Sequence, residues 1–127
     1  MSELQMNQSL LICVVDDDES PRESLEGLLK SLGYAVAVFS SAESFLASKS
    51  CADTDCLILD VGMPGMSGPD LQGELIARNQ MLPIIFITAQ ADDDVISRVM
   101  ADGAVDCLLK PFSEEAFLSA IDRALHG

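Results

Sequence analysis

Basic residues are scarce in this chain of 127 residues. Lys and Arg together number 7 against 21 Asp and Glu, so the formal net charge is -14 at pH 7. A chain this acidic repels the phosphate backbone of nucleic acids and the anionic surface of membranes. We therefore expect no direct contact with nucleic acid or membrane. The negative charge is compatible with binding of cations, with binding of basic protein surfaces, or simply with solubility.

Long apolar runs and metal-binding cysteine motifs are also missing. The longest early apolar run, residues 10–15, is too short for the core of a signal peptide, and no segment approaches the ~20 apolar residues of a membrane span. The four cysteines form no C-x-x-C pair, and His126 is the one histidine, which disfavours zinc. Cys13, Cys56 and Cys107 lie in apolar runs and are expected to be buried. Buried free thiols indicate a reducing cytoplasm, and the even number of cysteines leaves a disulfide as the alternative. The sequence thus predicts a cytoplasmic protein.

The composition is that of an ordinary globular domain, with 49% apolar and 22% charged residues. Residues 1–9 are polar and are predicted to form a tail, and residues 10–127 a single domain. Within the domain, short β-rich runs alternate with amphipathic helical patterns. The strands are expected near residues 10–15, 35–39, 56–59, 84–88 and 105–109. This alternation is typical of an α/β three-layer sandwich, a parallel sheet with helices on both faces.

Capping residues predict where the helices begin. Pro21 fits the first turn of a helix that ends at Gly33. Ser40 and Glu43 have the spacing of a capping box, which predicts one helix from there through about Lys49. The remaining caps are expected at Ser67, Asp92–Asp94 and Ser113. The Asp92–Asp94 run fits the positive end of a helix dipole better than a second metal site.

Polar residues follow four of the predicted strands. They are the acidic run 16–19, Asp60, Thr88 and Lys110. In an open parallel sheet these positions meet at the carboxyl edge, where ligands bind. Carboxylates ~4 Å apart repel each other by about 4 kcal/mol at an effective dielectric constant near 20, so the cluster must take up a proton or a cation. One lysine cannot neutralise it, and Mg²⁺ (or Mn²⁺) is the expected complement.

Such a site is suited to phosphoryl chemistry. A carboxylate beside a divalent cation and an ammonium group can attack phosphorus and hold an acyl phosphate. The hydroxyl of Thr88 could then donate a hydrogen bond to a phosphoryl oxygen.

Four sequence blocks strengthen this interpretation. They are VVDDDES (14–20), LILDVGMPGMSG (57–68), IIFITA (84–89) and GAVDCLLKPF (103–112). With these blocks in this order, the chain resembles the receiver domain of two-component response regulators over about residues 10–125. The resemblance implies a flavodoxin-like (βα)5 fold with the strand order 2-1-3-4-5.

The resemblance also implies a role for each site residue. Asp60 would be the phosphoacceptor, Thr88 the switch hydroxyl and Lys110 the partner of the phosphoryl group, joined to Pro111 by a cis bond. Asp17 would bind Mg²⁺ directly and Asp16 mainly through water. The complete implied set of metal ligands is Asp16, Asp17, Asp60 and the backbone carbonyl of Gly62.

The same resemblance implies how the domain would function. The phosphodonor would be a histidine kinase or a small molecule such as acetyl phosphate, and the domain would be a switch rather than a metabolic enzyme. The face formed by the fourth helix, the fifth strand and the fifth helix would change partners, for output or in a phosphorylation-dependent homodimer. VDDDES and KPF resemble the subgroup with a helix-turn-helix output domain, which implies transcription regulation. That domain is absent from these 127 residues and is an expected partner.

Two positions depart from the family pattern. Cys107 stands three residues before Lys110, where the family usually has an aromatic residue, which favours signalling by loop and helix shifts. Gly62 has no side chain that could influence dephosphorylation.

Several other functions remain as alternatives. A single-domain phospho-shuttle and a degenerate docking receiver fit the same fold. A haloacid-dehalogenase-type phosphohydrolase would need a second aspartate at the position of Gly62. A flavodoxin would need a phosphate-binding loop after the first strand, where this chain is acidic.

Overall fold

The computed structural model describes residues 10–127, so the predicted tail, residues 1–9, lies outside the described residues. The described residues contain a five-stranded parallel sheet in the order β2-β1-β3-β4-β5. The predicted strand order is therefore confirmed. The predicted strand ranges differ from the observed ones by at most one residue at either end. The strands are β1 (Leu11–Val15), β2 (Ala35–Phe39), β3 (Cys56–Asp60), β4 (Ile84–Thr88) and β5 (Asp106–Leu109). Because all strands are parallel, their carboxyl ends meet at one edge of the sheet.

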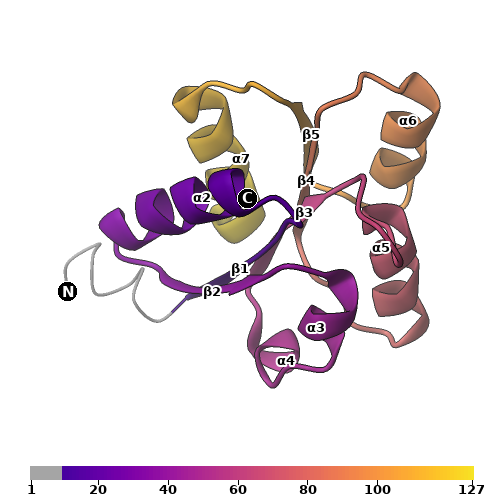
Figure 1. Ribbon diagram of the computed structural model, residues 1–127, viewed down its shortest axis with the longest axis horizontal. Helices are drawn as coiled ribbons and strands as arrows, with labels where there is room; N and C mark the ends of the chain where they lie inside the picture. The colour runs from indigo at the N-terminus through magenta and orange to yellow at the C-terminus, as the bar shows by residue number, and fades with distance from the viewer. Residues whose placement is uncertain (1–9) are drawn as a thin grey trace.

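Helices cover both faces of the sheet and make the three layers that the sequence predicts (Figure 1). One face carries α2 (Glu19–Ser31) and α7 (Glu114–His126). The other face carries α3 (Ala42–Leu46), α4 (Ser50–Asp53), α5 (Gly68–Ala77) and α6 (Asp93–Ala101). Within residues 10–127, each helix is too short or too polar to span a bilayer.

The core lies on both sides of the central strands. Leu57 and Phe86 pack with Phe45 of α3 on one side, and Ile58 packs with Phe117 of α7 on the other. Each of these side chains is at most 1% exposed. Strands that are buried on both faces need uninterrupted apolar runs, which explains the continuous apolar segments of the sequence.

Three of the predicted caps and the predicted place of Pro21 are confirmed, and the fourth predicted cap is wrong. The side chains of Ser67, Asp92 and Ser113 cap α5, α6 and α7, and Pro21 lies in the first turn of α2. The predicted cap at Ser40 is one residue away from the observed cap. The hydroxyl of Ser41 caps α3 by accepting the Ser44 N–H at 3.1 Å.

The single helix predicted through Lys49 is also wrong, because α3 ends at Leu46 and α4 begins only at Ser50. A side-chain turn separates the two helices, in which the hydroxyl of Ser48 accepts the Ser50 N–H at 2.9 Å. With the cap at Ser41, Glu43 is not at the capping-box position. Its carboxylate accepts the N–H of Met66 instead, 23 residues along the chain.

The cysteines are free thiols, and three of the four are buried. Burial raises the pKa of Cys56 to about 12, so this thiol is protonated and unreactive at neutral pH. Cys107 is only half-buried, contrary to the prediction, because β5 is an edge strand.

A buried amide connects α5 to α6. Gln72 is 3% exposed, and its Nε2 donates a hydrogen bond to the carbonyl of Val99 at 3.0 Å. This bond satisfies a polar group that would otherwise be costly to bury, and it holds the C-terminal half of α6 against α5.

Gly68 is a steric requirement of the fold. A Cβ at this position would overlap the backbone carbonyl oxygen of Asp60 and lie 3.1 Å from the ring of Phe86.

Gly68→Ala should therefore destabilise the protein by roughly 1–3 kcal/mol, as expected for an overpacked core. Urea unfolding measures the change. Gly73→Ala is the control on the same helix, since a Cβ there meets no atom within 4 Å, and it should stabilise by about 0.5–1 kcal/mol. Effects of equal sign in both variants would contradict the steric argument.

Candidate functional site

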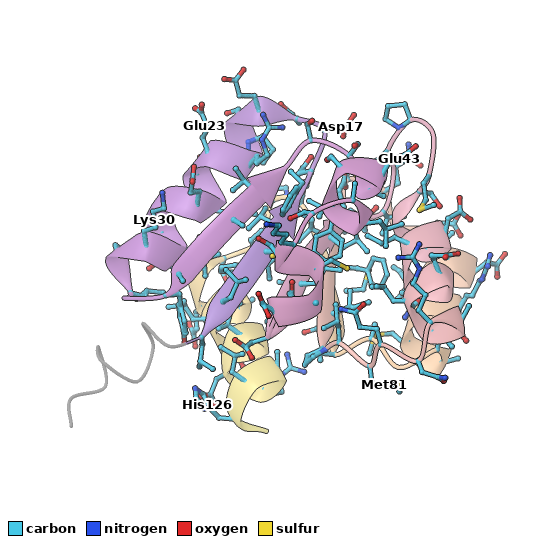
Figure 2. All side chains as sticks on the ribbon, turned by 90° about the horizontal axis from the view of Figure 1, so that it is seen from below. Asp17, Glu23, Lys30, Glu43, Met81 and His126 are labelled. Atoms are coloured by element: carbon cyan, nitrogen blue, oxygen red, sulfur yellow. The ribbon has the colours of Figure 1, made fainter. Side chains whose placement is uncertain are left out.

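Three carboxylates meet at the carboxyl edge of the sheet. Asp16 and Asp17 follow β1, and Asp60 is the last residue of β3. One oxygen from each carboxylate lies within 4.8 Å of the other two. Asp16 is fully buried and Asp60 is 7% exposed, whereas Asp17 faces solvent (Figure 2). The predicted convergence of the first and third strand ends is therefore observed.

Lys110 joins the carboxylates from the end of β5. Its Nζ donates to Oδ2 of Asp16 at 3.3 Å and lies 3.7 Å from Oδ1 of Asp60. Its backbone N–H donates to the carbonyl of Thr88 at 2.7 Å, which fixes the chain at this point. The Lys110–Pro111 peptide bond is cis, as expected.

The pKa of Asp60 is raised from 3.8 to about 6. The largest cause is burial, followed by the negative charge of Asp16; the positive charge of Lys110 acts in the opposite direction. The charge of Asp17 and a hydrogen bond to it raise the pKa of Asp60 further. The protein therefore holds this carboxylate in an environment that favours a proton or a cation.

Hydrogen bonds to both the side chain and the backbone of Asp16 hold the loop after β1. Oδ1 of Asp16 accepts the N–H of Asp18 at 3.0 Å, and Asp18 caps α2. Nη1 of Arg22 donates to the backbone carbonyl of Asp16 at 2.8 Å. The sequence prediction did not include Arg22. The sequence offered one indication of its role: basic residues are scarce in this chain, and Arg22 stands in the first turns of the helix that follows the acidic run.

Residues 61–67 form the β3–α5 loop, which links Asp60 to the cap of α5. Gly62 lies on this loop at the edge of the acidic site. The N–H of Gly68 donates to the carbonyl of Val61 at 3.0 Å and closes the base of the loop. The contact of Met66 with Glu43 on α3, which the sequence prediction also missed, lies at its tip.

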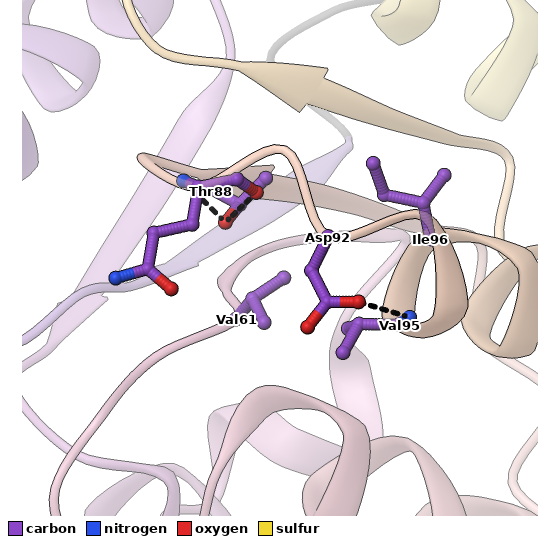
Figure 3. Close-up of a pocket in the computed structure, with 6 residues that line it drawn as sticks. Val61, Thr88, Asp92, Val95 and Ile96 are labelled. Atoms are coloured by element: carbon purple, nitrogen blue, oxygen red, sulfur yellow. Dashed lines mark hydrogen bonds between the residues drawn. The ribbon is translucent and has the colours of Figure 1, made fainter.

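Thr88 ends β4 and is 6% exposed. Its hydroxyl donates to the carbonyl of Gln90 and accepts the N–H of Gln90, both at 3.1 Å, so it is bound to the β4–α6 loop (Figure 3). Beside it, Val61, Val95 and Ile96 help to line a hollow of about 60 Å³. The predicted switch hydroxyl is thus physically linked to the loop that precedes α6.

The site residues line an open depression of about 580 Å³. Its walls contain the acidic residues, Thr88, Lys110 and the backbone around Gly62. A phosphoryl group fits easily into a space of this size. All the residues predicted from the sequence therefore lie around one cavity, together with Asp18, Val61, Ala89 and Gln90.

Two other candidate groups lie elsewhere. Asp92 caps α6 by accepting the N–H groups of Asp94 and Val95, which agrees with its predicted structural role. His126 lies at the end of the molecule opposite Asp17 (Figure 2). Among residues 10–127, Asp16, Asp17 and Asp60 are the group whose donor atoms are spaced to hold a metal ion.

The donor set of the acidic cluster fits a hard divalent cation. Mg²⁺ prefers carboxylate, carbonyl and water oxygens, and it is usually held by one or two carboxylates together with phosphate oxygens. The cluster offers three carboxylates, and the open depression leaves room for water and for a phosphoryl group. The residues present therefore fit the magnesium site expected from the sequence.

Comparison with known proteins identifies the family. The model of the response regulator receiver domain matches residues 12–122. Nodulation protein W of Bradyrhizobium diazoefficiens is 46% identical over 111 residues, which are 87% of this chain and 49% of that protein. The response regulator TmoT of Ectopseudomonas mendocina is 43% identical over 119 residues, 94% of this chain and 54% of that protein. The chain spans about half the length of these curated relatives.

Solved structures agree with this result. The response regulator StyR superposes with a TM-score of 0.85 at 45% identity, over 92% of this chain and 59% of that chain. The FixJ-N crystal structure superposes with a TM-score of 0.82 at 38% identity, over 92% of this chain and 94% of that chain. The fold and the acidic edge define a signalling receiver of the flavodoxin-like type. The chain belongs to the response regulator receiver domain family.

Asp60→Asn should stabilise the metal-free protein. The folded state raises the pKa of Asp60, so the wild type loses stability as the pH rises from about 4 to about 6, and this loss persists at higher pH. Asparagine carries no charge, so the variant should gain about 3 kcal/mol over the wild type at pH 7 and much less at pH 4. Urea unfolding in EDTA at both pH values measures the difference. Asp53→Asn, an exposed aspartate in α4, is the control and should change stability little at either pH. An equal effect of Asp60→Asn at both pH values would contradict the repulsion argument.

Proposed function

We propose that this chain is a phosphorylation-dependent switch in which Asp60 accepts a phosphoryl group from a histidine kinase. The observation that carries the proposal is the meeting of Asp16, Asp17, Asp60 and Lys110 around one open depression. Receiver domains are signalling switches rather than metabolic enzymes, and this family membership supports the same function.

Asp16, Asp17, Asp60 and the carbonyl of Gly62 would hold Mg²⁺, as is general for receiver domains. The cation would offset the negative charge of the incoming phosphoryl group. Lys110, already 3.7 Å from Oδ1 of Asp60, contributes a fixed positive charge on the same side. Asp60 would thus carry the reaction, and the other groups would position it and lower the electrostatic barrier.

In the transfer step, a carboxylate oxygen of Asp60 attacks the phosphorus of phosphohistidine. The new O–P bond forms as the P–N bond breaks, and the electron pair of that bond returns to the imidazole nitrogen. Acetyl phosphate reacts in the same way, with acetate as the leaving group. Water reverses the modification by attacking phosphorus and releasing the free carboxylate.

The hydroxyl of Thr88 would transmit the change. Its present partners are the N–H and the carbonyl of Gln90. When the hydroxyl turns to a phosphoryl oxygen, these bonds break and the β4–α6 loop is released, which alters the face formed by α6, β5 and α7. To shift the ratio of the active to the inactive conformation from 1:99 to 99:1, phosphorylation must stabilise the active conformation by about 5.5 kcal/mol relative to the inactive one. Hydrogen bonds to a charged group supply about 1.5–3 kcal/mol each, so about two to four of them would be needed.

The whole protein would act in the cytoplasm through partners beyond this domain. The chain spans about half of relatives such as TmoT, whose name describes a response regulator protein. We infer a cognate histidine kinase, an output domain that regulates transcription, and dimerisation promoted by phosphorylation. The acidic charge of this domain leaves contact with nucleic acid to the output domain.

Acetyl phosphate with Mg²⁺ should add one labile phosphoryl group to the protein, as detected by intact-mass measurement. Asp60→Asn should abolish this addition because it removes the attacking oxygen. Asp53→Asn, which removes an exposed aspartate in α4, is the matched control and should be phosphorylated like the wild type. A stable phosphoryl group on Asp60→Asn would exclude Asp60 as the acceptor.

Thr88→Ala should uncouple phosphorylation from the change at the α6–β5–α7 face. The variant should still accept a phosphoryl group on Asp60, but the chemical-shift changes that NMR detects in α6 and β5 should be largely lost. Thr88→Ser keeps the hydroxyl and should retain them. If Thr88→Ala responded like the wild type, the link through Gln90 would be wrong.

A further inference from the structure

The β3–α5 loop carries Gly62, whose backbone carbonyl is an expected ligand of Mg²⁺. We propose that Glu43, on the neighbouring helix α3, is a positioning residue that fixes the tip of this loop and thereby the place of that carbonyl. The inference rests on the proposed function, because it concerns the same metal site. It assigns a role to a side chain outside the acidic cluster.

The base of the loop is already held without Glu43. The N–H of Val61 donates to the carbonyl of Ile87 at 2.9 Å, and the N–H of Gly68 donates to the carbonyl of Val61 at 3.0 Å. Met63 is 8% exposed and packs into the core beneath the loop. These contacts place the two ends and one side chain of the loop, but not its tip.

The tip, Gly65 and Met66, rests on the Glu43 carboxylate. Oε2 of Glu43 accepts the N–H of Met66 at 3.3 Å. A Cβ at Gly65 would lie 2.7 Å from the same oxygen, and Gly65 has a φ of +74°, a conformation that favours glycine. The loop thus turns tightly against the carboxylate, and both its hydrogen bond and its close packing depend on Glu43. Figure 2 shows Glu43 at the same end of the molecule as Asp17.

Gly62 lies between the held base and the tip, in an exposed part of the loop. Within residues 10–127, and apart from Gly62 and its two chain neighbours, no atom lies within 4 Å of the position that a Cβ of Gly62 would occupy. The space beside its Cα is therefore open, and no neighbouring side chain presses on this residue from that side. The Gly62 carbonyl belongs to the peptide unit that joins Gly62 to Met63. A shift at Gly65 and Met66 would therefore reach this carbonyl through the backbone of Met63, whose buried side chain acts as the pivot.

Two properties of Glu43 can be separated by substitution. Glu43→Gln keeps an oxygen that can accept the Met66 N–H but removes the charge, whereas Glu43→Ala removes the acceptor as well. A pure charge effect on a cation would be similar in both variants. Glu23 is an exposed carboxylate at the same end of the molecule, so Glu23→Gln measures the effect of lost charge alone (Figure 2).

The test combines two measurements on the full chain. Amide hydrogen exchange of Met66, followed by NMR without metal, reports the hydrogen bond itself. Glu43→Ala should accelerate this exchange about 2- to 10-fold, and Glu43→Gln should stay near the wild type. Titration with Mg²⁺ alone reports the consequence, and Glu43→Ala should weaken binding roughly 3- to 10-fold. Glu43→Gln and Glu23→Gln should each change the affinity less than about 2-fold, because solvent and salt screen exposed charges.

Each alternative result has a definite meaning. Unchanged exchange of Met66 in Glu43→Ala would overturn the contact. Faster exchange with unchanged Mg²⁺ affinity would overturn the positioning role. If Glu43→Ala, Glu43→Gln and Glu23→Gln all weakened Mg²⁺ binding equally, the cause would be the lost charge, and the positioning role would be overturned as well. If the wild type bound no Mg²⁺, the proposed metal site itself would fail and the positioning role with it, whereas the exchange of Met66 would still report the contact separately.

Discussion

Repulsion between carboxylates at the edge of a buried sheet is the interaction on which the rest of this structure depends. Asp16 and Asp60 are almost fully buried, and Asp17 adds a third negative charge within a few ångströms. Within residues 10–127, the ion pairs of this cluster all come from Lys110. The arrangement costs stability, as the raised pKa of Asp60 indicates, so a fold without a use for it would gain by replacing one carboxylate. The repulsion lies at the place where a bound cation and a phosphoryl group would reduce it.

Around this cluster, hydrogen bonds fix three separate segments. Arg22 holds the loop after β1 through the Asp16 carbonyl, and Glu43 holds the loop after β3. Thr88 is bound to the backbone of Gln90 after β4. Two of these groups are charged side chains on helices that flank the site. The precision of the acidic site therefore depends on the surrounding helices as much as on the sheet that carries its residues.

The fold and the central residues could be predicted because they depend on local or repeating patterns. Continuous apolar runs identify strands buried on both faces, and parallel strands bring Asp60, Thr88 and Lys110 to one edge. The contacts of Glu43 and Arg22 could not be predicted in this way, because each joins two segments whose relative position is set by the packing of the helices. Glu43 also had a local explanation, the capping box with Ser40. The shift of the cap to Ser41 removed that explanation.

The buried amide of Gln72 has a consequence for the geometry of any movement in α6. The hydrogen bond to Val99 holds the helix near its C-terminal end, whereas Asp92 at the other end adjoins the β4–α6 loop. A displacement that preserves this bond would tilt α6 about the region of Val99. The angular change is the same along the helix, but the distance travelled grows toward Asp93. Surface contacts made by the first turn of α6 would thus differ most between the two positions of the helix. Contacts beside Val99 would change least.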